Sequence, residues 1–198
     1  MNIGLTGGIA SGKSTVSRLL RERGALIVDA DMISREIVMP GSPVLQQIAE
    51  EFGPEVLLDS GELDRKKLGA IIFSNEEKRM KLNAIMHPPI RAEMMRQIRQ
   101  YETENPDKLV VADIPLLYES KLQHMFSEVM VVYVPLPVQI ARLMERDGLT
   151  ESQAMERIRS QMPLEDKRRL ADVVIDNSGS LEETEKQLDQ YLERKGLR

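Results

Sequence analysis

The feature that most constrains this chain is a glycine-rich loop near its start. Residues 7–14 read G-G-I-A-S-G-K-S, which matches the pattern G-x-x-x-x-G-K-[ST] of a phosphate-binding loop (P-loop). An apolar run at residues 3–6 precedes the loop, and Val16, Leu19 and Leu20 follow it at helical spacing. The loop is therefore predicted to join a buried strand to a helix. These flanks favour a P-loop over a glycine-rich turn without a ligand.

The residue types in the loop suit phosphate binding. Glycines accept positive φ, so the backbone N–H groups can turn inward, and the helix that follows adds the positive end of its dipole. Lys13 supplies a mobile positive charge, and the Ser14 hydroxyl is a ligand for Mg2+. The predicted ATP-binding residues of the loop are Gly8, Ile9, Ala10, Ser11, Gly12, Lys13, Ser14, Thr15 and Val16.

Composition excludes several classes of protein. The 198 residues carry a net charge of -5, which argues against a nucleic-acid partner. No apolar run is long enough to span a bilayer, and the start of the chain lacks the pattern of an export signal. The sequence contains no cysteine, which fits a reducing compartment, so a cytoplasmic location is expected. No obligate protein partner is inferred.

Five apolar runs alternate with helical patterns, which predicts an α/β fold with a five-stranded parallel sheet flanked by helices. The runs lie at residues 3–6, 25–28, 109–113, 129–134 and 173–175. The predicted core contains residues 1–31, 106–137 and 170–198. Residues 32–105 are mostly helical and too long for a simple crossover, so they are predicted to form a separate substrate-binding insertion. A two-helix lid is predicted at residues 138–169.

Within the insertion, a helix over residues 76–86 is expected to be interrupted at His87-Pro88-Pro89 before helix resumes at residues 90–102.

Acidic residues follow two of the predicted strands. Asp29 and Asp31 come after the second strand, and Asp113 closes the third, where a Walker-B aspartate that holds Mg2+ directly or through water is expected. Ligands of open α/β sheets bind at the carboxyl ends of the strands. The alternative for Asp29 or Asp31 is to cap the next helix, and the location of the pair favours a role in function.

Arginines recur on the two predicted lid helices. Arg142 and Arg146 stand four residues apart, as do Arg157 and Gln161. Such arginines can close over a triphosphate, or they can form a solvated face paired with neighbouring acids; spacing alone does not decide between these two interpretations.

A regulatory GTPase would need an N-K-x-D motif, which is absent, and a D-x-x-G motif after the third strand. The D-x-x-G at residues 176–179 follows the fifth strand instead. A kinase for a small acceptor remains, with a P-loop for ATP and a lid that excludes water.

The chain resembles the dephospho-CoA kinase family from residue 4 to residue 179. The resemblance is carried by G-L-T-G-G-I and S-G-K-S-T at residues 4–15, D-A-D at 29–31, L-D-R at 63–65, H-P at 87–88, D-I-P-L-L-Y-E at 113–119, residues 139–142, R-D at 146–147, Q-M-P at 161–163, Lys167, A-D at 171–172 and N-S-G at 177–179. The family often has glycine where Ala10 stands, which is tolerable here if the φ of Ala10 is negative.

The resemblance implies transfer of the γ-phosphoryl group of ATP to the ribose 3'-hydroxyl of dephospho-CoA. It implies that Asp31 accepts the proton of that hydroxyl, and that Lys13 and Arg142 neutralise charge on the transferred group. Ser14 would hold Mg2+, with Asp113 as a second candidate ligand. The implied adenine neighbours are Asn177 and Gly179, and the implied contacts to dephospho-CoA are Asp29, Asp31, Arg65, His87, Leu116 and Tyr118.

A kinase of the shikimate or gluconate type is the alternative. Such a kinase can share the D-x-D after the second strand, but it lacks the long insertion that carries His-Pro.

Overall fold

The computed structural model describes residues 1–197, and the chain divides into two compact units. The first unit contains Met1–Val28 and the chain from Ile98 onward, and the second contains Asp29–Gln97. Each unit is described by itself below. The three-part division into core, insertion and lid stays a prediction.

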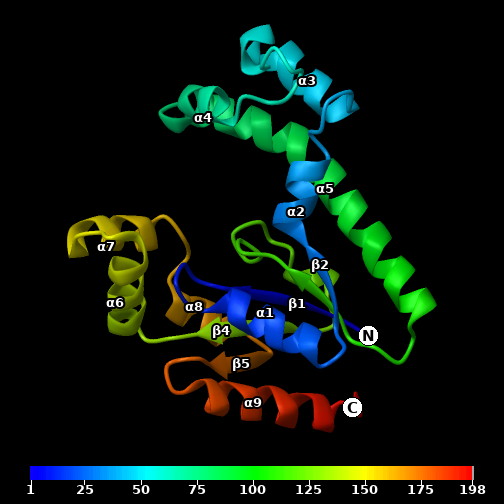
Figure 1. Cartoon of the computed structure of the whole chain (residues 1–198), viewed down its shortest axis with the longest axis vertical. Helices are drawn as coiled ribbons and strands as arrows, with labels where there is room; N and C mark the ends of the chain where they lie inside the picture. The colour runs from blue at the N-terminus through cyan, green and yellow to red at the C-terminus, as the bar shows by residue number, and fades with distance from the viewer. Residues whose placement is uncertain (198) are drawn as a thin grey trace. The chain divides into compact units, whose positions relative to one another are not determined.

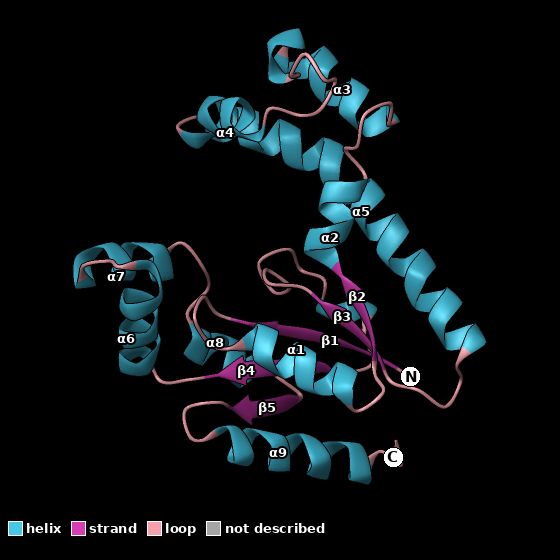
Figure 2. Cartoon of the chain, viewed as in Figure 1, coloured by secondary structure: helices cyan, strands magenta, loops and turns pink. Residues whose placement is uncertain are grey.

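The first unit is built on a five-stranded sheet with the strand order β2-β3-β1-β4-β5 (Figure 2). Its strands are β1 (Asn2–Gly7), β2 (Leu26–Asp29), β3 (Val110–Asp113), β4 (Val129–Tyr133) and β5 (Val173–Asp176). Its helices are α1 (Lys13–Glu22), η2 (Gln123–Met125), α6 (Leu136–Asp147), α7 (Glu151–Arg159), α8 (Leu164–Leu170) and α9 (Leu181–Arg194). β1 pairs in parallel with both β3 and β4, and β4 pairs in parallel with β5. The predicted fold class is confirmed.

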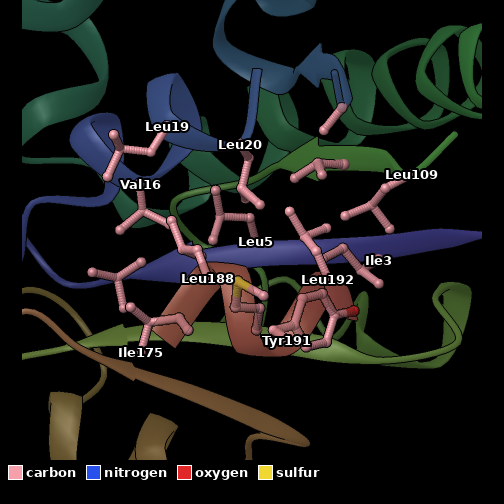
Figure 3. Close-up of a cluster of buried hydrophobic side chains, with 14 residues drawn as sticks. Ile3, Leu5, Val16, Leu19, Leu20, Leu109, Ile175, Leu188, Tyr191 and Leu192 are labelled. Carbon is pink, nitrogen blue, oxygen red and sulfur yellow. The ribbon is translucent and has the colours of Figure 1, made fainter. Parts of the chain in front are cut away.

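The core of this unit lies between the sheet and the helices α1 and α9. Figure 3 shows Val16, Leu19 and Leu20 of α1 packing with side chains of α9 over the central strand β1. Leu188, Tyr191 and Leu192 come from α9, and Ile3 and Leu5 come from β1. These side chains are almost completely removed from solvent, so the hydrophobic effect holds the start of the chain firmly in the sheet.

The strand order fixes where the loops meet. Because β1 lies between β3 and β4, the loop after β1 emerges between the segments that follow those two strands. In the sheet, β2 and β3 lie on one side of β1, and β4 and β5 lie on the other. Such a switch in strand order marks the place where α/β proteins bind ligands, at the carboxyl ends of the strands. α6 and α7 are consecutive helices that contact each other, and together they are called here the helical hairpin (Figure 1).

The second unit is helical and has its own core. It contains α2 (Ala30–Glu36), α3 (Pro43–Phe52), η1 (Pro54–Val56), α4 (Arg65–Phe73) and most of α5 (Glu76–Glu104). Its buried cluster is formed by Val38, Leu45, Ile48, Phe52, Val56 and Leu68. No helix among residues 1–197 is long and apolar enough to cross a membrane.

The expected interruption at His87-Pro88-Pro89 is wrong. α5 is a single helix of 29 residues with both prolines inside it. Each proline removes one backbone hydrogen bond at a cost of about 3 kcal/mol, so packing on both sides must compensate. Met86 packs against the core of the second unit before the prolines, and Met94 and Ile98 are buried after them. Tertiary burial thus overrides the local signal.

Candidate active site

The loop between β1 and α1 has the backbone geometry of an anion-binding turn. β1 ends at Gly7 and α1 begins at Lys13, and Gly12 before the helix has a φ of 86°. The Ser11 amide donates a hydrogen bond to the Gly8 carbonyl at 3.1 Å, which turns the chain back on itself. Amides in such a turn and at a helix N-terminus bind phosphate oxygens. The geometry suits the phosphate group that the motif predicts.

The condition stated for Ala10, a negative φ, is not met, because its φ is 59°. A residue with a Cβ in the left-handed region costs about 1–2 kcal/mol. The contacts around Ala10 offset this cost. The preceding carbonyl, that of Ile9, accepts a hydrogen bond from Gln139, and Ala10 itself packs against an apolar cluster formed by Leu143, Ala154 and Ile158.

Lys13 and Asp113 form an ion pair beside the loop. The Lys13 Nζ donates to Oδ1 of Asp113, the buried last residue of β3. Ser14 is exposed in the first turn of α1. No cluster of three or more acidic, histidine or cysteine side chains within residues 1–197 could hold a metal. Mg2+ commonly binds through one or two protein groups together with phosphates and water, so one hydroxyl and one carboxylate fit it.

The structure decides between the two interpretations that the sequence left open for the arginines of α6 and α7. Arg142 on α6 is half-buried, and its Nη2 donates to the Asn177 carbonyl at 2.9 Å. Arg146 and Arg157 instead pair with the exposed Asp147, at 2.7 and 2.8 Å. The interpretation as a solvated charged face therefore applies to Arg146 and Arg157. Arg142 instead reaches the segment after β5, whose Asn177 side chain contacts the loop.

Asn177, predicted as an adenine neighbour, holds the loop with its side chain. Its Nδ2 donates to the Ser11 carbonyl at 2.9 Å, and its Oδ1 accepts from the Thr184 hydroxyl at 2.8 Å. A Cβ on Gly12 would lie only 2.1 Å from the Asn177 Nδ2, so glycine is needed there for close approach as well as for φ. Gly179 follows in the turn before α9. A role for either residue at adenine stays a prediction.

Lys167 is a buried cation that belongs to the family resemblance but received no role from the sequence. Its Nζ donates to the Gly7 carbonyl at 2.9 Å and to the Pro115 carbonyl at 3.2 Å, and it pairs with the Glu119 carboxylate at 2.9 Å. Burial lowers the pKa of Lys167, and Glu119 opposes that shift. Residues 165–169 read E-D-K-R-R, a charged run typical of an exposed helix, so no local signal marks its one buried member.

Two glutamines complete the surroundings of the loop. The Gln139 Nε2 donates to the Ile9 carbonyl at 2.8 Å, and the Ile9 amide donates to the Gln161 Oε1 at 2.9 Å. Gln139 is buried in α6, and Gln161 lies just after α7. The resemblance to the family includes both positions, but it gave neither a role.

The segment after β3 carries two predicted contacts to dephospho-CoA with different exposure. Leu116 is 43% exposed, whereas Tyr118 is 6% exposed and its hydroxyl has no hydrogen-bond partner. Burial, together with the negative charge of Asp172, raises the pKa of Tyr118 to about 12. Tyr118 is therefore neutral at physiological pH.

The second unit contains the remaining predicted residues. Asp29 caps α2, because its Oδ1 accepts from the amides of Asp31 and Met32 at 2.9 and 3.0 Å. The capping alternative thus holds for Asp29. Asp31 lies in the first turn of α2, two residues after β2 ends. The structure does not bring Asp31 and the loop together within one unit.

Arg65 and His87 lie on different helices of this unit. Arg65 is the first residue of α4, directly after Asp64, whose side chain caps that helix. His87 stands inside α5. Partial burial and the nearby charge of Arg91 lower the pKa of His87, so its imidazole is mostly neutral at pH 7.

Comparisons with known proteins agree on one family. The family described as CoaE, dephospho-CoA kinase, matches residues 1–183. A dephospho-CoA kinase of Bacillus licheniformis is 53% identical over 96% of this chain and 94% of its own length. The crystal structure of TT1252 from Thermus thermophilus has a TM-score of 0.81 at 35% identity, covering 98% of this chain and 97% of its own. Dephospho-CoA kinase from Campylobacter jejuni has a TM-score of 0.76 at 31% identity, covering 100% and 98%.

Proposed function

The chain belongs to the dephospho-CoA kinase family, and from that premise we propose how its own residues perform the reaction. The reaction transfers the γ-phosphoryl group of ATP to the ribose 3'-hydroxyl of dephospho-CoA, giving CoA and ADP in coenzyme A biosynthesis. The regulatory GTPase and the kinases of shikimate or gluconate type are thereby set aside. The use of ATP supports the cytoplasmic location expected from the sequence.

The loop at residues 8–16 binds the phosphates of ATP through backbone amides. Lys13 neutralises charge on the β- and γ-phosphates, and to do so it exchanges its ion pair with Asp113 for the phosphate oxygens. Because Asp113 is buried, losing this partner is costly unless another cation replaces it. Binding of the nucleotide and rearrangement of this ion pair are therefore coupled.

Ser14 and Asp113 are the residues that would hold Mg2+. The exposed hydroxyl and the buried carboxylate match the oxygen ligands that this ion prefers. When bound, the ion supplies positive charge to the phosphate oxygens. Asp113 would then keep a cationic partner when Lys13 turns to the phosphates.

Arg142 stabilises charge that develops on the transferred phosphoryl group. Its guanidinium reaches the segment after β5 through the Asn177 carbonyl, and that segment also contacts the loop. Only part of its donor set is used in this bond, since a guanidinium carries five N–H donors. The remaining donors are available to phosphate oxygens.

Asp31 accepts the proton of the attacking hydroxyl. The ribose 3'-oxygen forms a bond to the γ-phosphorus, the bond from that phosphorus to the β-phosphate oxygen breaks, and ADP leaves. The proton from the hydroxyl passes to the Asp31 carboxylate. Support comes from the position of Asp31 two residues after β2, with Asp29 holding the start of α2 by its cap.

Dephospho-CoA is held by Asp29, Asp31, Arg65, His87, Leu116 and Tyr118. Leu116 offers an exposed apolar surface, and the mostly neutral imidazole of His87 can donate or accept a hydrogen bond. Tyr118 contributes by fixing the segment that carries Leu116, because its own hydroxyl is buried. Arg65 supplies positive charge for the phosphates of the acceptor.

The observation that carries this proposal is the meeting of Lys13, from the loop, with Asp113, from the end of the neighbouring strand. An assay of ADP release tests it with dephospho-CoA, shikimate, gluconate and nucleoside monophosphates as acceptors. ADP release with dephospho-CoA alone, with CoA as product, is expected. Equal turnover of shikimate or gluconate contradicts the assignment.

A further inference from the structure

Two side-chain amides hold carbonyl groups on the outer side of the P-loop. Gln139 donates to the Ile9 carbonyl at 2.8 Å, and Asn177 donates to the Ser11 carbonyl at 2.9 Å. In a planar trans peptide, the carbonyl and the N–H of the next residue point in opposite directions. The N–H groups of Ala10 and Gly12 therefore point away from these two amides.

The two residues whose N–H groups are oriented in this way both have left-handed backbone conformation. Ala10 has a φ of 59° and Gly12 a φ of 86°. Left-handed residues that alternate with ordinary ones make a concave row of N–H groups that binds anions. Strained backbone of this kind persists only where surrounding contacts fix it. For Ala10, which has a Cβ, the bond from Gln139 to the preceding carbonyl supplies such a contact.

The glycines of the loop leave room for the two amides. A Cβ on Gly8 would lie 2.7 Å from the Gln139 Nε2, and a Cβ on Gly12 would lie 2.1 Å from the Asn177 Nδ2. Neither neighbour can easily withdraw, because Gln139 is 3% and Asn177 9% exposed. Each amide thus requires a glycine beside it, and each holds a carbonyl one residue away from that glycine.

Both backbone polar groups of Ile9, the N–H and the carbonyl, form hydrogen bonds with side chains at the base of the helical hairpin. Its carbonyl accepts from Gln139 at the start of α6, and its amide donates to Gln161 after the end of α7. Ile9 and Ala10 also pack against the apolar cluster of α6 and α7. A change at the base of the hairpin is therefore transmitted directly to the backbone of the loop.

We propose that Gln139 is a positioning residue for phosphoryl transfer, which holds the Ile9 carbonyl so that the Ala10 N–H is aimed at the phosphates of ATP. Gln139 belongs to α6. The same bond therefore makes the phosphate-binding conformation of the loop depend on the position of the helical hairpin. The role rests on the proposed function of the loop as the ATP site.

A matched pair of substitutions tests whether donation by Gln139 matters. Gln139→Glu keeps the size of the side chain but loses the N–H that Ile9 needs, whereas Gln161→Glu keeps the oxygen that accepts from Ile9. Both place one negative charge beside the same residue, and both side chains line a cavity of about 420 Å3 with room for hydration. The difference between the two variants thus reports the loss of the bond to the Ile9 carbonyl, which lacks a donor and faces a carboxylate only in Gln139→Glu.

Calorimetric binding of ADP and steady-state kinetics with ATP are the measurements. In Gln139→Glu, the Kd of ADP and the KM of ATP are expected to rise about tenfold more than in Gln161→Glu, the factor of one lost hydrogen bond. The value of kcat is expected to fall in Gln139→Glu, while the affinity for dephospho-CoA without nucleotide stays unchanged. Equal effects of the two substitutions overturn the proposal.

Tyr191→Phe calibrates the consequences of lost stability alone. It removes the hydrogen bond that the Tyr191 hydroxyl donates to Glu128. Tyr191 lies in α9 and Glu128 lies just before β4, so both are far in sequence from the loop. It is expected to lower Tm without changing ADP affinity. If Gln139→Glu behaves in the same way, its role is structural and the proposal fails. If the unaltered protein binds neither ATP nor ADP, the proposed ATP site fails instead.

Discussion

The two units hold their predicted functional residues in different ways. In the first unit, the loop carbonyls of Gly7, Ile9 and Ser11 are held by side chains between 130 and 166 residues away in the sequence. In the second unit, the residues around Asp31 and Arg65 are held by helix caps only two or three residues away. The proposed site for the phosphoryl donor is thus shaped by the tertiary structure, whereas the proposed acceptor residues are shaped locally.

This contrast leads to opposite expectations for substitutions. A change at a locally held residue should alter the chemistry with little effect on folding. A change at a residue that joins distant segments should alter stability and nucleotide binding together. The predictions below test this contrast.

Asp31→Asn tests the second unit, in which the proposed acceptor residues are held by local helix caps. Loss of the proton acceptor is expected to lower kcat by about 100-fold or more. ATP affinity and Tm should stay close to those of the unaltered protein, because the cap of α2 is made by the Asp29 side chain and the Asp31 backbone. Rapid-quench kinetics, ATP titration and thermal melting measure the three quantities. Unchanged turnover would remove Asp31 from the chemistry.

Lys167→Met tests the side of the comparison that depends on distant contacts. It leaves the Glu119 carboxylate without its buried partner and frees the Gly7 carbonyl, so the free energy of unfolding is expected to fall by about 3–5 kcal/mol. Denaturant titration measures this loss. The double variant with Glu119→Gln removes the unpaired charge and should recover part of it. A Lys167→Met protein as stable as the original contradicts the role of this pair.

The local part of the site was predictable from the sequence. The first strand, the loop and the start of α1 lie within residues 2–22, and their motif and hydrophobic spacing agree with the structure. The five strands were also found, because buried parallel strands form continuous apolar runs. The cap by Asp29 also follows a local rule, although the sequence favoured a functional role for this residue over capping.

The contacts that hold the loop were not predictable in this way. The roles of Gln139 and Lys167 depend on which helix returns to the loop, and no pattern in a single sequence states that pairing. The interruption of α5 was mispredicted for the same reason, and the left-handed backbone of Ala10 was not foreseen. In each case tertiary contacts outweigh a local preference of a few kcal/mol.

Arg142→Ala tests a residue that belongs to the nucleotide side but acts on the reaction. Turnover is expected to fall by about tenfold to 100-fold, because one donor to the developing charge is lost. ATP affinity should fall less, and Tm should change little, since a single bond to the Asn177 carbonyl is removed. Measuring both kcat and the Kd of ATP shows whether Arg142 acts on turnover or on ATP binding. Equal losses in both would make Arg142 a binding residue only.

Arg146→Ala is the matched control on the same helix. Arg146 pairs with the exposed Asp147 rather than with the loop segment, so its removal is expected to leave both kcat and ATP affinity almost unchanged.

His87→Gln tests whether the second unit responds to pH by itself. An unfolded histidine has its ordinary pKa of about 6.5. The folded pKa is lower because of partial burial and the charge of Arg91. Between these two values the unfolded chain binds more protons, so the stability of the second unit should decrease as pH falls below about 6.5. Since His87 is partly solvated, the loss should be less than about 1 kcal/mol.

Hydrogen exchange of the amides of α5 at pH 5 and pH 7.5 measures this loss, and His87→Gln should lessen the difference between the two pH values. If the variant retains the full pH effect, another group is responsible. If its KM for dephospho-CoA also stays constant, His87 serves packing in the helix rather than binding of the acceptor.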